Sequence, residues 1–242
     1  MSEVTLRDLR GMAEFLAAER LQRAVWGEGD SPDPADLMMV IQAEGGLCAG
    51  AFRGGELVGY VFGFPTRDRT VQHSHRLAVL PQARGLKLGV RLKWYQRDWC
   101  QRHGIALVRW TFDPLRRTNA SLNIDTLGAT GKVYHPDYYG DMAGINAGAP
   151  SDRLLAEWRL EAPGVGARAR GLRPQPEPGE ILGRVGIPPD FAALLSGAPD
   201  LALAERLRVR ESLQAAFASG LEIGGFDREA GDYLLVRRGE PA

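Results

Sequence analysis

Apolar residues recur along the first part of the chain with the spacing of helices and then of strands. Residues 5–25 place apolar side chains three or four positions apart, the period of one helix face, and residues 34–44 predict a second, shorter helix. Two strands follow at 47–52 and 57–64. They meet at Gly54-Gly55, a pair that predicts a tight hairpin because both turn positions need a positive φ. The apolar stripe of the first helix consists of Leu6, Leu9, Met12 and Leu16.

The middle of the chain alternates strand and helix patterns. A third strand is predicted over 73–80, followed by a turn that Pro81 opens. The next apolar stripe has helical spacing, and Gly104 ends that helix. Residues 105–112 form the clearest strand, because they alternate between two faces. The helical stripe is Leu88, Leu92, Tyr95 and Trp99; the strand turns Ala106, Val108, Trp110 and Phe112 to one side and Leu107, Arg109, Thr111 and finally Asp113 to the other.

The second half predicts further helices and strands around an irregular segment. A helix is expected at 118–127, and Gly128 ends it. Residues 162–179 are rich in Pro, Gly and Arg, a composition typical of a linker. Strands are expected at 132–138, 154–160 and 181–187, a long helix at 201–219, and a hairpin from 221–226 with 233–237.

The composition limits the partners and the compartment. The chain has 242 residues, 44% hydrophobic and 25% charged, as in a folded protein with one large domain or a domain and a smaller appendage. Its 30 basic and 30 acidic residues cancel, so no nucleic acid and no membrane is expected as a partner. No apolar run predicts a membrane span or a signal peptide, and we expect a cytoplasmic protein. Cys48 and Cys100 are too few for a disulfide framework or a cysteine metal site.

Residues 84–89, Arg-Gly-Leu-Lys-Leu-Gly, are the most informative segment for function. They lie between the strand at 73–80 and a strong helix pattern. A glycine-bearing turn that opens a helix presents backbone N–H groups and the positive end of the helix dipole, and both favour a bound phosphate. Alone, these six residues favour an ordinary helix N-terminus. The elements on either side are what point to a phosphate site.

The order of the elements resembles that of the GNAT acyltransferase superfamily. The acyl-CoA signature of that superfamily, Arg/Gln-x-x-Gly-x-Gly/Ala, maps onto Arg84, Lys87 and Gly89. The resemblance implies an α/β fold, in the α+β sense, with a mixed, mostly antiparallel central sheet flanked by helices. It divides the chain into a GNAT core at 1–161, a linker at 162–179 and a small C-terminal α/β extension at 180–242.

Several short segments are similar to a bacterial GNAT subfamily that carries a C-terminal extension. Some related groups are thought to acylate amino acids, including with succinyl groups. The resemblance therefore implies an N-acyltransferase with acetyl-CoA as the default donor, succinyl-CoA as an alternative donor, and a small amine or amino acid as the acceptor. The similar segments are 110–115, 119–124, 127–129, 138–140, 146–148 and 150–153.

The resemblance also implies which residues hold the coenzyme. In GNAT enzymes the pantetheine arm pairs with open backbone groups of the fourth strand, and the pyrophosphate lies on the turn. Lys87 stands where the signature has glycine, which adds a side chain at a crowded point and an ammonium that can pair with phosphate. Asn119 is expected near the coenzyme, or as a helix cap. The other expected contacts are Leu77, Ala78 and Val79 on the strand and Arg84, Gly85, Leu86, Lys87, Leu88, Gly89 and Val90 on the turn.

Direct attack on the thioester requires a base, because a free amine is mostly protonated at neutral pH. His75 and Asp113 are the candidates, and His73 shares the strand face of His75. Each also has a structural interpretation, since Asp before Pro often caps a turn and a strand histidine is often a satisfied structural group. A His-x-His pair can bind a metal, but no third ligand is evident, so no metal is expected.

A tyrosine often reprotonates the thiolate in GNAT enzymes, and Ile124 stands at its place. Tyr139, or Tyr138, is the expected replacement; the thiolate can also leave without an acid because its pKa is modest. Arg153 is a candidate to hold an acceptor carboxylate in a bidentate fork, or a solvated surface residue. The other expected substrate contacts are Arg109, Thr111, Asn146 and Ser151.

Two other functions fit the same sequence. The altered glycine and the absent tyrosine also fit a non-catalytic acyl-CoA-binding or regulatory module. The C-terminal extension has a possible role in assembly, in which it completes the sheet of a second copy in a homodimer.

Overall fold

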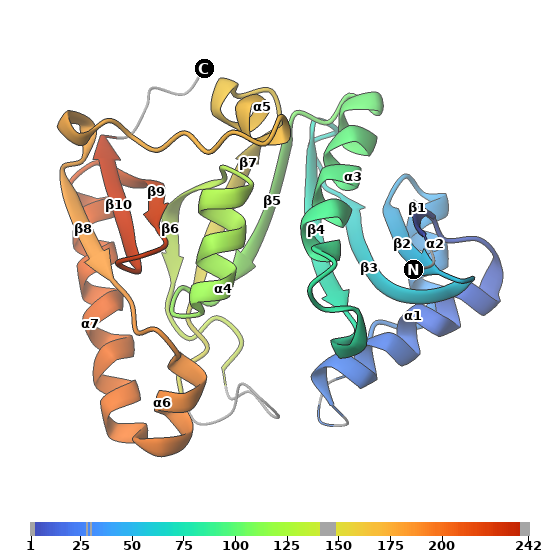
Figure 1. The fold of residues 1–242 in the computed structure, drawn as a ribbon, viewed down its shortest axis with the longest axis horizontal. Helices are drawn as coiled ribbons and strands as arrows, with labels where there is room; N and C mark the ends of the chain where they lie inside the picture. The colour runs from blue at the N-terminus through green and yellow to red at the C-terminus, as the bar shows by residue number, and fades with distance from the viewer. Residues whose placement is uncertain (1–2, 28, 30, 141–148, 238–242) are drawn as a thin grey trace. The chain divides into compact units, whose positions relative to one another are not determined.

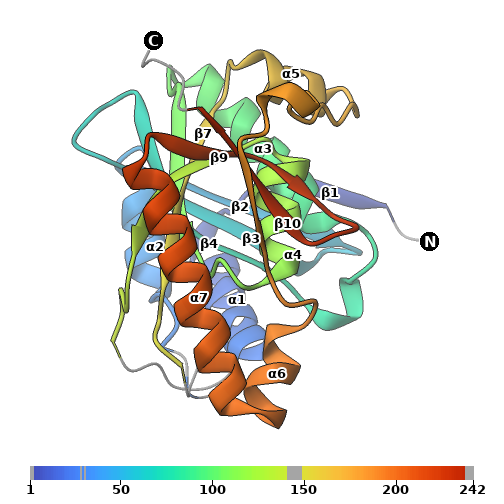
Figure 2. The same ribbon diagram turned by 90° about the vertical axis from the view of Figure 1, so that its left-hand side faces the viewer.

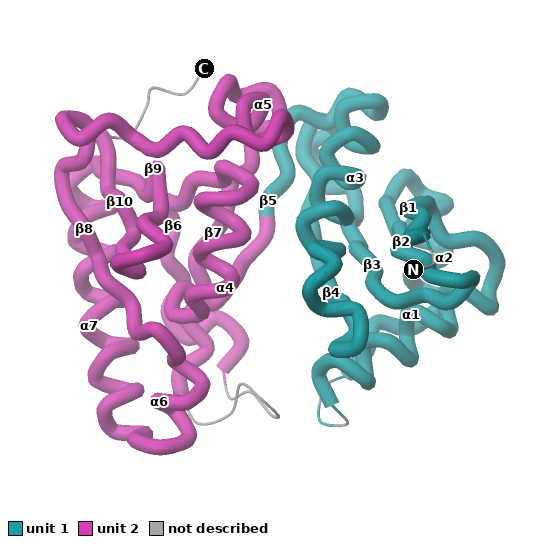
Figure 3. The backbone as a smooth tube through the Cα atoms, viewed as in Figure 1, with its two compact units in different colours: residues 1–109, 143–145 teal, residues 110–142, 146–242 magenta. Residues whose placement is uncertain are grey.

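The computed structural model describes residues 3–27, 29, 31–140 and 149–237. The chain forms two units, one up to Arg109 and the other from Trp110 onward, which Figure 3 colours teal and magenta. Strand β5, Leu107–Phe112, crosses this boundary. Each unit has its own strands, helices and buried core.

Unit 1 is built on strands in the order β1-β2-β3-β4-β5 (Figure 1). Neighbours from β1 to β4 are antiparallel, and β4 and β5 are parallel, which agrees with the predicted mixed, mostly antiparallel sheet. Helices α1, α2 and α3 pack against these strands. The bounds are β1 Val4–Asp8, α1 Gly11–Trp26, α2 Ala35–Ala43, β2 Leu47–Arg53, β3 Glu56–Pro65, β4 Val71–Val79, a 3₁₀ turn η1 Pro81–Ala83, and α3 Leu88–Arg102.

The predicted helix at 5–25 is wrong at its start. Residues Val4–Asp8 instead form strand β1, which pairs with β2 along its whole length. Helix α1 begins only at Gly11, whose φ of 66° lies in the left-handed region. Pairing with a distant strand, which local spacing does not reveal, decides the conformation of the first segment. As a result α1 buries Phe15, Ala18, Leu21 and Gln22, while Met12 and Leu16 of the predicted stripe are 39% and 42% exposed.

The predictions for the hairpin, for the helix before Gly104 and for β5 are confirmed. Gly54 and Gly55 join β2 to β3 with φ of 59° and 88°, as a two-residue hairpin turn requires. Helix α3 and strand β5 bury most of the apolar face that the spacing predicted; Tyr95 is half-buried, and Ala106 is exposed and precedes β5. The buried positions are Leu88, Leu92 and Trp99 on α3 and Val108, Trp110 and Phe112 on β5.

A buried polar layer joins α3 to β4. Lys93 is 2% exposed, and its Nζ donates to Ser74 Oγ at 3.0 Å and to Gln96 Oε1 at 2.8 Å. Gln96 Nε2 in turn donates to Gln72 Oε1 at 2.7 Å. Burial lowers the pKa of Lys93 to about 7, because these neutral partners stabilise an ammonium less well than water does.

Unit 2 continues from the end of β5 with the strand order β5-β7-β6-β9-β10-β8. Its long helix α7 packs against β6, β8 and β9, and Figure 2 shows α7 running from α6 towards β9. The predicted helix at 118–127 is confirmed as α4 with a π-helical continuation, in which Ile124 is buried. The bounds are α4 Arg117–Ala120, the π-helix η2 Ser121–Thr126, β6 Thr130–His135, β7 Arg153–Arg159, α5 Pro163–Ala169, η4 Pro178–Glu180, β8 Gly183–Gly186, α6 Phe191–Gly197, α7 Pro199–Ala218, β9 Leu221–Asp227 and β10 Asp232–Arg237.

The C-terminal part of the chain is built into unit 2. The predicted strand, helix and hairpin after residue 180 are confirmed as β8, α7 and β9–β10. Tyr233 of β10 is buried, and its hydroxyl donates to Pro114 O at 2.7 Å. The segment at 162–179 contains helix α5, whose Arg168 donates to Asp125 O at 2.8 Å. The division into a core at 1–161, a linker and an extension stays a prediction.

The Lys93 layer predicts how stability depends on pH. At pH 6 to 7 we expect Lys93→Met to raise the free energy of unfolding by a few kcal/mol, because it removes the cost of burying a charged group. The folded-state pKa of about 7 lies below the ordinary value of 10.5, so between these values the unfolded chain holds a proton that the folded chain lacks. The wild-type protein is therefore expected to gain stability as pH rises through this window. The Lys93→Met variant is expected to lack this increase.

Urea unfolding at pH 6, 7, 8 and 9 measures the effect. Lys87→Met, at an exposed lysine, is the matched control and is expected to keep the wild-type slope of stability against pH. A Lys93→Met protein with the same slope as the wild type would show that Lys93 does not titrate in this window.

Candidate active site

Strand β4 has an open edge in unit 1. Among the described residues, β5 pairs with β4 only at Val71, Gln72 and His73. The later residues of β4, up to Val79, pair with β3 on the other side. Half of the backbone N–H and C=O groups at 77–79 therefore point away from β3 without a strand partner. These are the residues expected to pair with an extended amide-bearing arm.

The turn at 84–89 presents backbone donors at the start of α3. Arg84 N donates to Pro81 O, and the next main-chain hydrogen bond along this stretch runs from Arg91 N to Lys87 O. Among the described residues none accepts a hydrogen bond from the backbone N–H groups between these two. The segment therefore combines unused donors with the N-terminus of a helix, which suits an anion. These donors belong to Gly85, Leu86, Lys87, Leu88, Gly89 and Val90.

Lys87 adopts the backbone conformation that the signature glycine would supply. Its φ and ψ of 53° and 29° are left-handed, and it directly precedes the first residue of α3. This conformation costs a non-glycine residue about 1–2 kcal/mol. The Lys87 side chain is exposed, so its ammonium can reach an anion on the turn without displacing a protein group.

His75 of β4 pairs with Asp33, a residue that the sequence reasoning missed. His75 Nε2 lies 3.2 Å from Asp33 Oδ1. Asp33 is itself held, because its N–H donates to Oε1 of the buried Gln22 at 2.8 Å and its second oxygen lies 3.3 Å from Arg76 Nε. A carboxylate on one ring nitrogen orients an imidazole and leaves the other nitrogen for proton transfer.

His73 has a different environment from His75. Its ring stacks on Phe64 with centroids 4.9 Å apart. Burial and then the neighbouring His75 lower its pKa to about 4. His73 is therefore neutral near pH 7. Among the described residues no group of three or more His, Cys, Asp or Glu side chains is placed to hold a metal ion.

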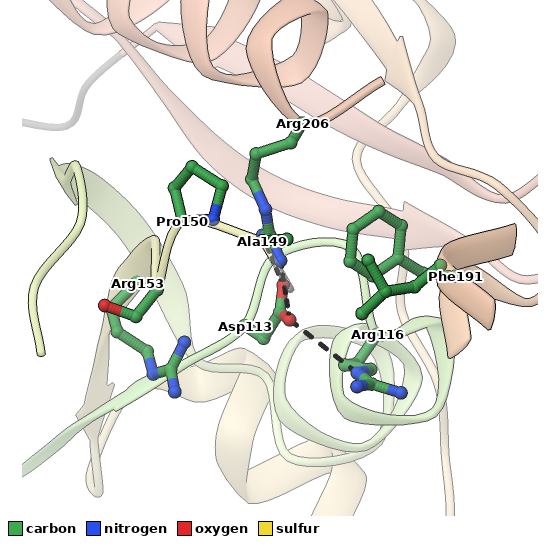
Figure 4. Close-up of a pocket in the computed structure, with 9 residues that line it drawn as sticks. Asp113, Arg116, Ala149, Pro150, Arg153, Phe191 and Arg206 are labelled. Atoms are coloured by element: carbon green, nitrogen blue, oxygen red, sulfur yellow. Dashed lines mark hydrogen bonds and ion pairs between the residues drawn. The ribbon is translucent and has the colours of Figure 1, made fainter. Parts of the chain in front are cut away.

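Asp113 in unit 2 is held by arginines (Figure 4). Arg206 of α7 donates to both of its oxygens, at 2.6 and 2.9 Å, and Arg116 Nε lies at 3.7 Å. Asp113 Oδ1 also accepts from Leu115 N at 2.9 Å, which is the turn cap that an Asp before Pro favours. Burial alone would lower the pKa of Arg206, but the hydrogen bonds and charge of Asp113 raise it. This pairing favours a counter-ion role for Asp113 over that of a base.

A second carboxylate, Asp152, anchors the loop before β7. It is fully buried, and Arg210 of α7 donates to its two oxygens at 2.9 and 2.6 Å. Tyr134 Oη and Asp137 N donate to it at 2.7 and 3.0 Å. Burial alone would raise the pKa of Asp152, but these donors hold it below its ordinary value. Sequence reasoning missed both Asp152 and Arg210.

Four expected substrate or acid residues meet around this loop. Tyr139 N donates to Ser151 Oγ at 2.8 Å, and Tyr139 Oη lies 3.4 Å from Thr111 Oγ1. The Arg153 guanidinium lies over the Tyr139 ring, 5.0 Å from its centre, and donates to Asp152 O at 2.8 Å. Burial lowers the pKa of Arg153. The structure thus brings Thr111, Tyr139, Ser151 and Arg153 together.

The remaining predicted residues are dispersed. Arg109 is exposed at the end of unit 1, and Asn119 lies half-buried in α4, where its N–H donates to Arg116 O at 2.8 Å. Tyr138 is exposed, with its ring against that of Tyr139. Asn146 lies outside the described residues.

Comparison with known proteins connects this geometry to a family. Residues 13–120 match the family model described as the acetyltransferase (GNAT) family. No curated protein sequence matches the chain.

Solved structures share the fold at low sequence identity. The ribosomal-protein-S18-alanine N-acetyltransferase from Escherichia coli is 16% identical with a TM-score of 0.53, covering 65% of this chain and 94% of its own. The Salmonella typhimurium protein yncA, whose structure holds acetyl-CoA, is 18% identical with a TM-score of 0.52, covering 66% and 95%. A phosphinothricin acetyltransferase from Sinorhizobium meliloti in complex with acetyl-CoA is 18% identical with a TM-score of 0.50, covering 64% and 86%. At these identities the likeness shows a common fold.

The Arg210–Asp152 pair predicts a large effect of a single substitution on stability. Arg210→Met is expected to lower the free energy of unfolding by about 3–5 kcal/mol, because it leaves a buried carboxylate without its cation. Arg208→Met on the same helix is the matched control. Its exposed pair with Glu205 is expected to contribute only about 1 kcal/mol or less.

Chemical denaturation measures both variants, together with Asp152→Asn and the Arg210→Met/Asp152→Asn double variant. The double variant is expected to lose less stability than the sum of the two single losses, because it leaves no unpaired charge. Equal losses in Arg210→Met and Arg208→Met would contradict the anchoring role of Asp152.

Proposed function

We propose that this chain, which belongs to the GNAT acetyltransferase superfamily through residues 13–120, transfers the acetyl group of acetyl-CoA to the amine of a small molecule or amino acid. Acetyl-CoA-dependent acyl transfer is the reaction of the family. Two structures of the same fold hold acetyl-CoA, which supports it as the donor. The nature of the acceptor is our proposal.

The observation that carries the proposal is the pair of backbone sites in unit 1. The open edge of β4 at 77–79 suits the amides of the pantetheine arm, and the unused N–H groups at 85–90 suit a pyrophosphate. The first site lies just before the short turn η1 and the second just after it, so one continuous stretch of chain supplies both. Metal is not required for either contact.

Direct attack then needs only positioning and proton transfer. The acceptor nitrogen forms a bond to the thioester carbonyl carbon, and the carbon–sulfur bond breaks. We assign the base to His75, which takes the ammonium proton while Asp33 holds its ring. We assign Tyr139 as the acid that returns a proton to the departing thiolate. Asp113 serves as the counter-ion of Arg206 beside the substrate residues.

Two alternatives are tested by the same assays. A non-catalytic acyl-CoA-binding or regulatory module would bind coenzyme A and release no thiol with any amine or amino acid. A succinyltransferase would release thiol faster from succinyl-CoA than from acetyl-CoA with the same acceptor.

The compartment and the assembly stay predictions. Over the part of the chain that the structure describes, no helix has both the length and the apolar character needed to cross a bilayer. We retain the cytoplasm as the proposed compartment and a homodimer as the proposed assembly. Fractionation and light scattering test them.

Lys87 predicts a salt-dependent contribution to coenzyme binding. Lys87→Ala is expected to weaken coenzyme A binding by about three- to tenfold and to reduce its dependence on salt, because one exposed ion pair to phosphate is lost. Lys87→Arg is expected to keep both the affinity for coenzyme A and its dependence on salt. Lys87→Gly is expected to behave like Lys87→Ala in its salt dependence while relieving the left-handed strain.

Titration calorimetry at several sodium chloride concentrations measures these affinities. Folded wild-type protein that binds no coenzyme A would end the proposed function. Wild-type salt dependence in Lys87→Ala would show that Lys87 does not contact the phosphates.

The His75–Asp33 pair predicts a change in the pH profile of catalysis. His75→Asn is expected to lower kcat by about 10²- to 10⁴-fold at neutral pH. Activity is expected to recover towards alkaline pH, where more of the acceptor amine is deprotonated in solution. Asp33→Asn is expected to have a smaller effect in the same direction.

His73→Asn is the matched control on the same strand, because His73 is already neutral near pH 7. Steady-state kinetics from pH 6 to 9, with coenzyme A affinity as the folding check, distinguishes the three variants. A His75→Asn enzyme with a wild-type profile would remove His75 from the mechanism.

A further inference from the structure

A buried lysine lies close to the start of helix α3, the helix that follows the proposed coenzyme turn. The helix begins at Leu88, and Lys93 is five residues further on, which is about 7.5 Å along the helix axis. The Lys93 side chain is removed from solvent. An anion on the backbone N–H groups at 85–90 would therefore lie on the order of 10 Å from a lysine that is itself buried in the protein.

The polar layer around Lys93 is rich in hydrogen-bond donors. Nζ of Lys93 donates to Ser74 Oγ and to Gln96 Oε1. Gln72 Oε1 accepts from Gln96 Nε2, and Cys100 Sγ lies 3.3 Å from the same oxygen. Gln72 Nε2 has no acceptor among the described residues, although Gln72 is fully buried. Because a neutral amine has one donor fewer and one acceptor more than an ammonium, this arrangement favours the neutral form of Lys93 on hydrogen bonding as well as on burial.

Strands β2 and β3 turn uncharged residues towards this side of α3, and β4 contributes the neutral Ser74 and Gln72. Gly63 of β3 faces the helix, because a Cβ there would lie 3.0 Å from Gln96 Nε2. Side chains alternate along a strand and paired residues share a face, so the other residues that face α3 follow from the register. They are Gly59, Val61 and Gly63 of β3 and Leu47, Ala49 and Ala51 of β2.

Other titratable and charged groups also surround the lysine. Burial raises the pKa of the Cys100 thiol to about 12 and lowers the pKa of His73, on the opposite face of β4, to about 4. Arg97, one turn further along α3, carries a constant positive charge. Asp8 of β1 accepts from Tyr95 at 2.8 Å, and Tyr95 lies two positions beyond the lysine, on a different side of the helix. Cys100 and His73 therefore stay neutral near pH 7, where the lysine changes its charge.

An anion at the start of α3 shifts this balance towards the ammonium. Two unit charges about 10 Å apart, at the effective dielectric constant of about 20 that suits protein sites, interact strongly enough to change a proton equilibrium about tenfold. Salt reduces the effect, because the Debye length at physiological ionic strength is about 8 Å. A pyrophosphate with two charges is therefore expected to raise the pKa of Lys93 by roughly one unit.

We propose that Lys93 is a proton-linked cation of the coenzyme turn, so that binding of the coenzyme pyrophosphate at 85–90 takes up a proton from solvent onto the Lys93 amine. The identity of the ligand rests on the proposed acyl transfer. Only an N–H bond forms, and the buffer supplies the proton. Because the protonated form binds the anion better, coenzyme affinity falls as pH rises through neutrality. Lys87 thus makes affinity depend on salt, whereas Lys93 makes it depend on pH.

Calorimetry in two buffers with different ionisation enthalpies, phosphate and Tris, counts the protons taken up. At pH 7.5 the wild type is expected to take up about half a proton per coenzyme A, the difference for a pKa that rises by about one unit from about 7. Its affinity is expected to fall about three- to tenfold from pH 6 to 9. 3′-Dephospho-coenzyme A is the second ligand, because it lacks the phosphate monoester that itself titrates near pH 6.

Two variants isolate the contribution of the buried lysine. Lys93→Met is expected to bind both ligands without the wild-type proton uptake and with a flatter dependence of affinity on pH. Lys132→Met is the matched control, because it removes the same charge from unit 2, where Lys132 pairs with Glu157. It is expected to keep the wild-type proton uptake.

Nuclear magnetic resonance gives a readout on the wild-type chain itself. The lysines are Lys87, Lys93 and Lys132, so labelling lysine side chains with ¹³C gives a spectrum simple enough to assign with the variants. The titration midpoint of Lys93 is expected to rise by roughly one unit when 3′-dephospho-coenzyme A is added.

The outcomes separate this inference from the proposed function. Coenzyme A that binds without proton uptake, with proton release, or with equal uptake in the wild type and Lys93→Met would overturn the inference and leave the acyltransferase proposal intact. A Lys93 midpoint that the ligand does not move would overturn it as well. Folded protein that binds no coenzyme A would end the proposed function, and the inference would fall with it.

Discussion

Two arginines on one helix hold two carboxylates, one largely and one fully removed from solvent, and the packing of unit 2 depends on them. Arg206 and Arg210 stand four positions apart on α7, so they face the same side of the helix. Each grips its carboxylate with two nitrogens, Asp113 after β5 and Asp152 before β7. Because removing one partner of such a pair leaves the other charge largely buried without its counter-ion, each pair ties α7 to its loop. Helix α7 is therefore tied by ion pairs to the rest of unit 2.

This constraint also determines the chemistry around Asp113. The Asp113 carboxylate accepts two guanidinium hydrogen bonds and caps the turn at Leu115, so both of its oxygens are already engaged by protein donors. It contributes a negative charge beside Arg206 and Arg116. The base is better sought where a ring nitrogen remains available, and the His75–Asp33 pair of unit 1 meets that condition. Of the two base candidates that the sequence offered, the geometry therefore favours His75 as the proposed base and Asp113 as a counter-ion.

Local features of the fold were predictable, and long-range pairings were not. The Gly54-Gly55 hairpin, the buried stripe of α3 and the alternation of β5 follow from spacing and turn chemistry within a few residues. Strand β1 was missed because its partner β2 lies far along the chain. The Asp113–Arg206 contact spans 93 positions and Asp152–Arg210 spans 58, and helical periodicity gives no information about such partners. Asp33 was missed for the same reason, since 42 positions separate it from His75.

The left-handed Lys87, at the turn where we propose that the coenzyme binds, combines a conformational cost with an electrostatic gain. The turn into α3 needs a left-handed residue, and lysine adopts it at a cost of about 1–2 kcal/mol relative to glycine. An ammonium about 4 Å from a phosphate gains about 1 kcal/mol in water and about 4 kcal/mol near a protein surface, before screening. The gain and the cost are of the same order, but the strain acts on folding and the ion pair acts on binding. Replacing glycine by lysine therefore lowers stability and adds the ion pair to the proposed affinity. It changes what the affinity depends on, because the backbone amides remain and a salt-sensitive contact is added to them.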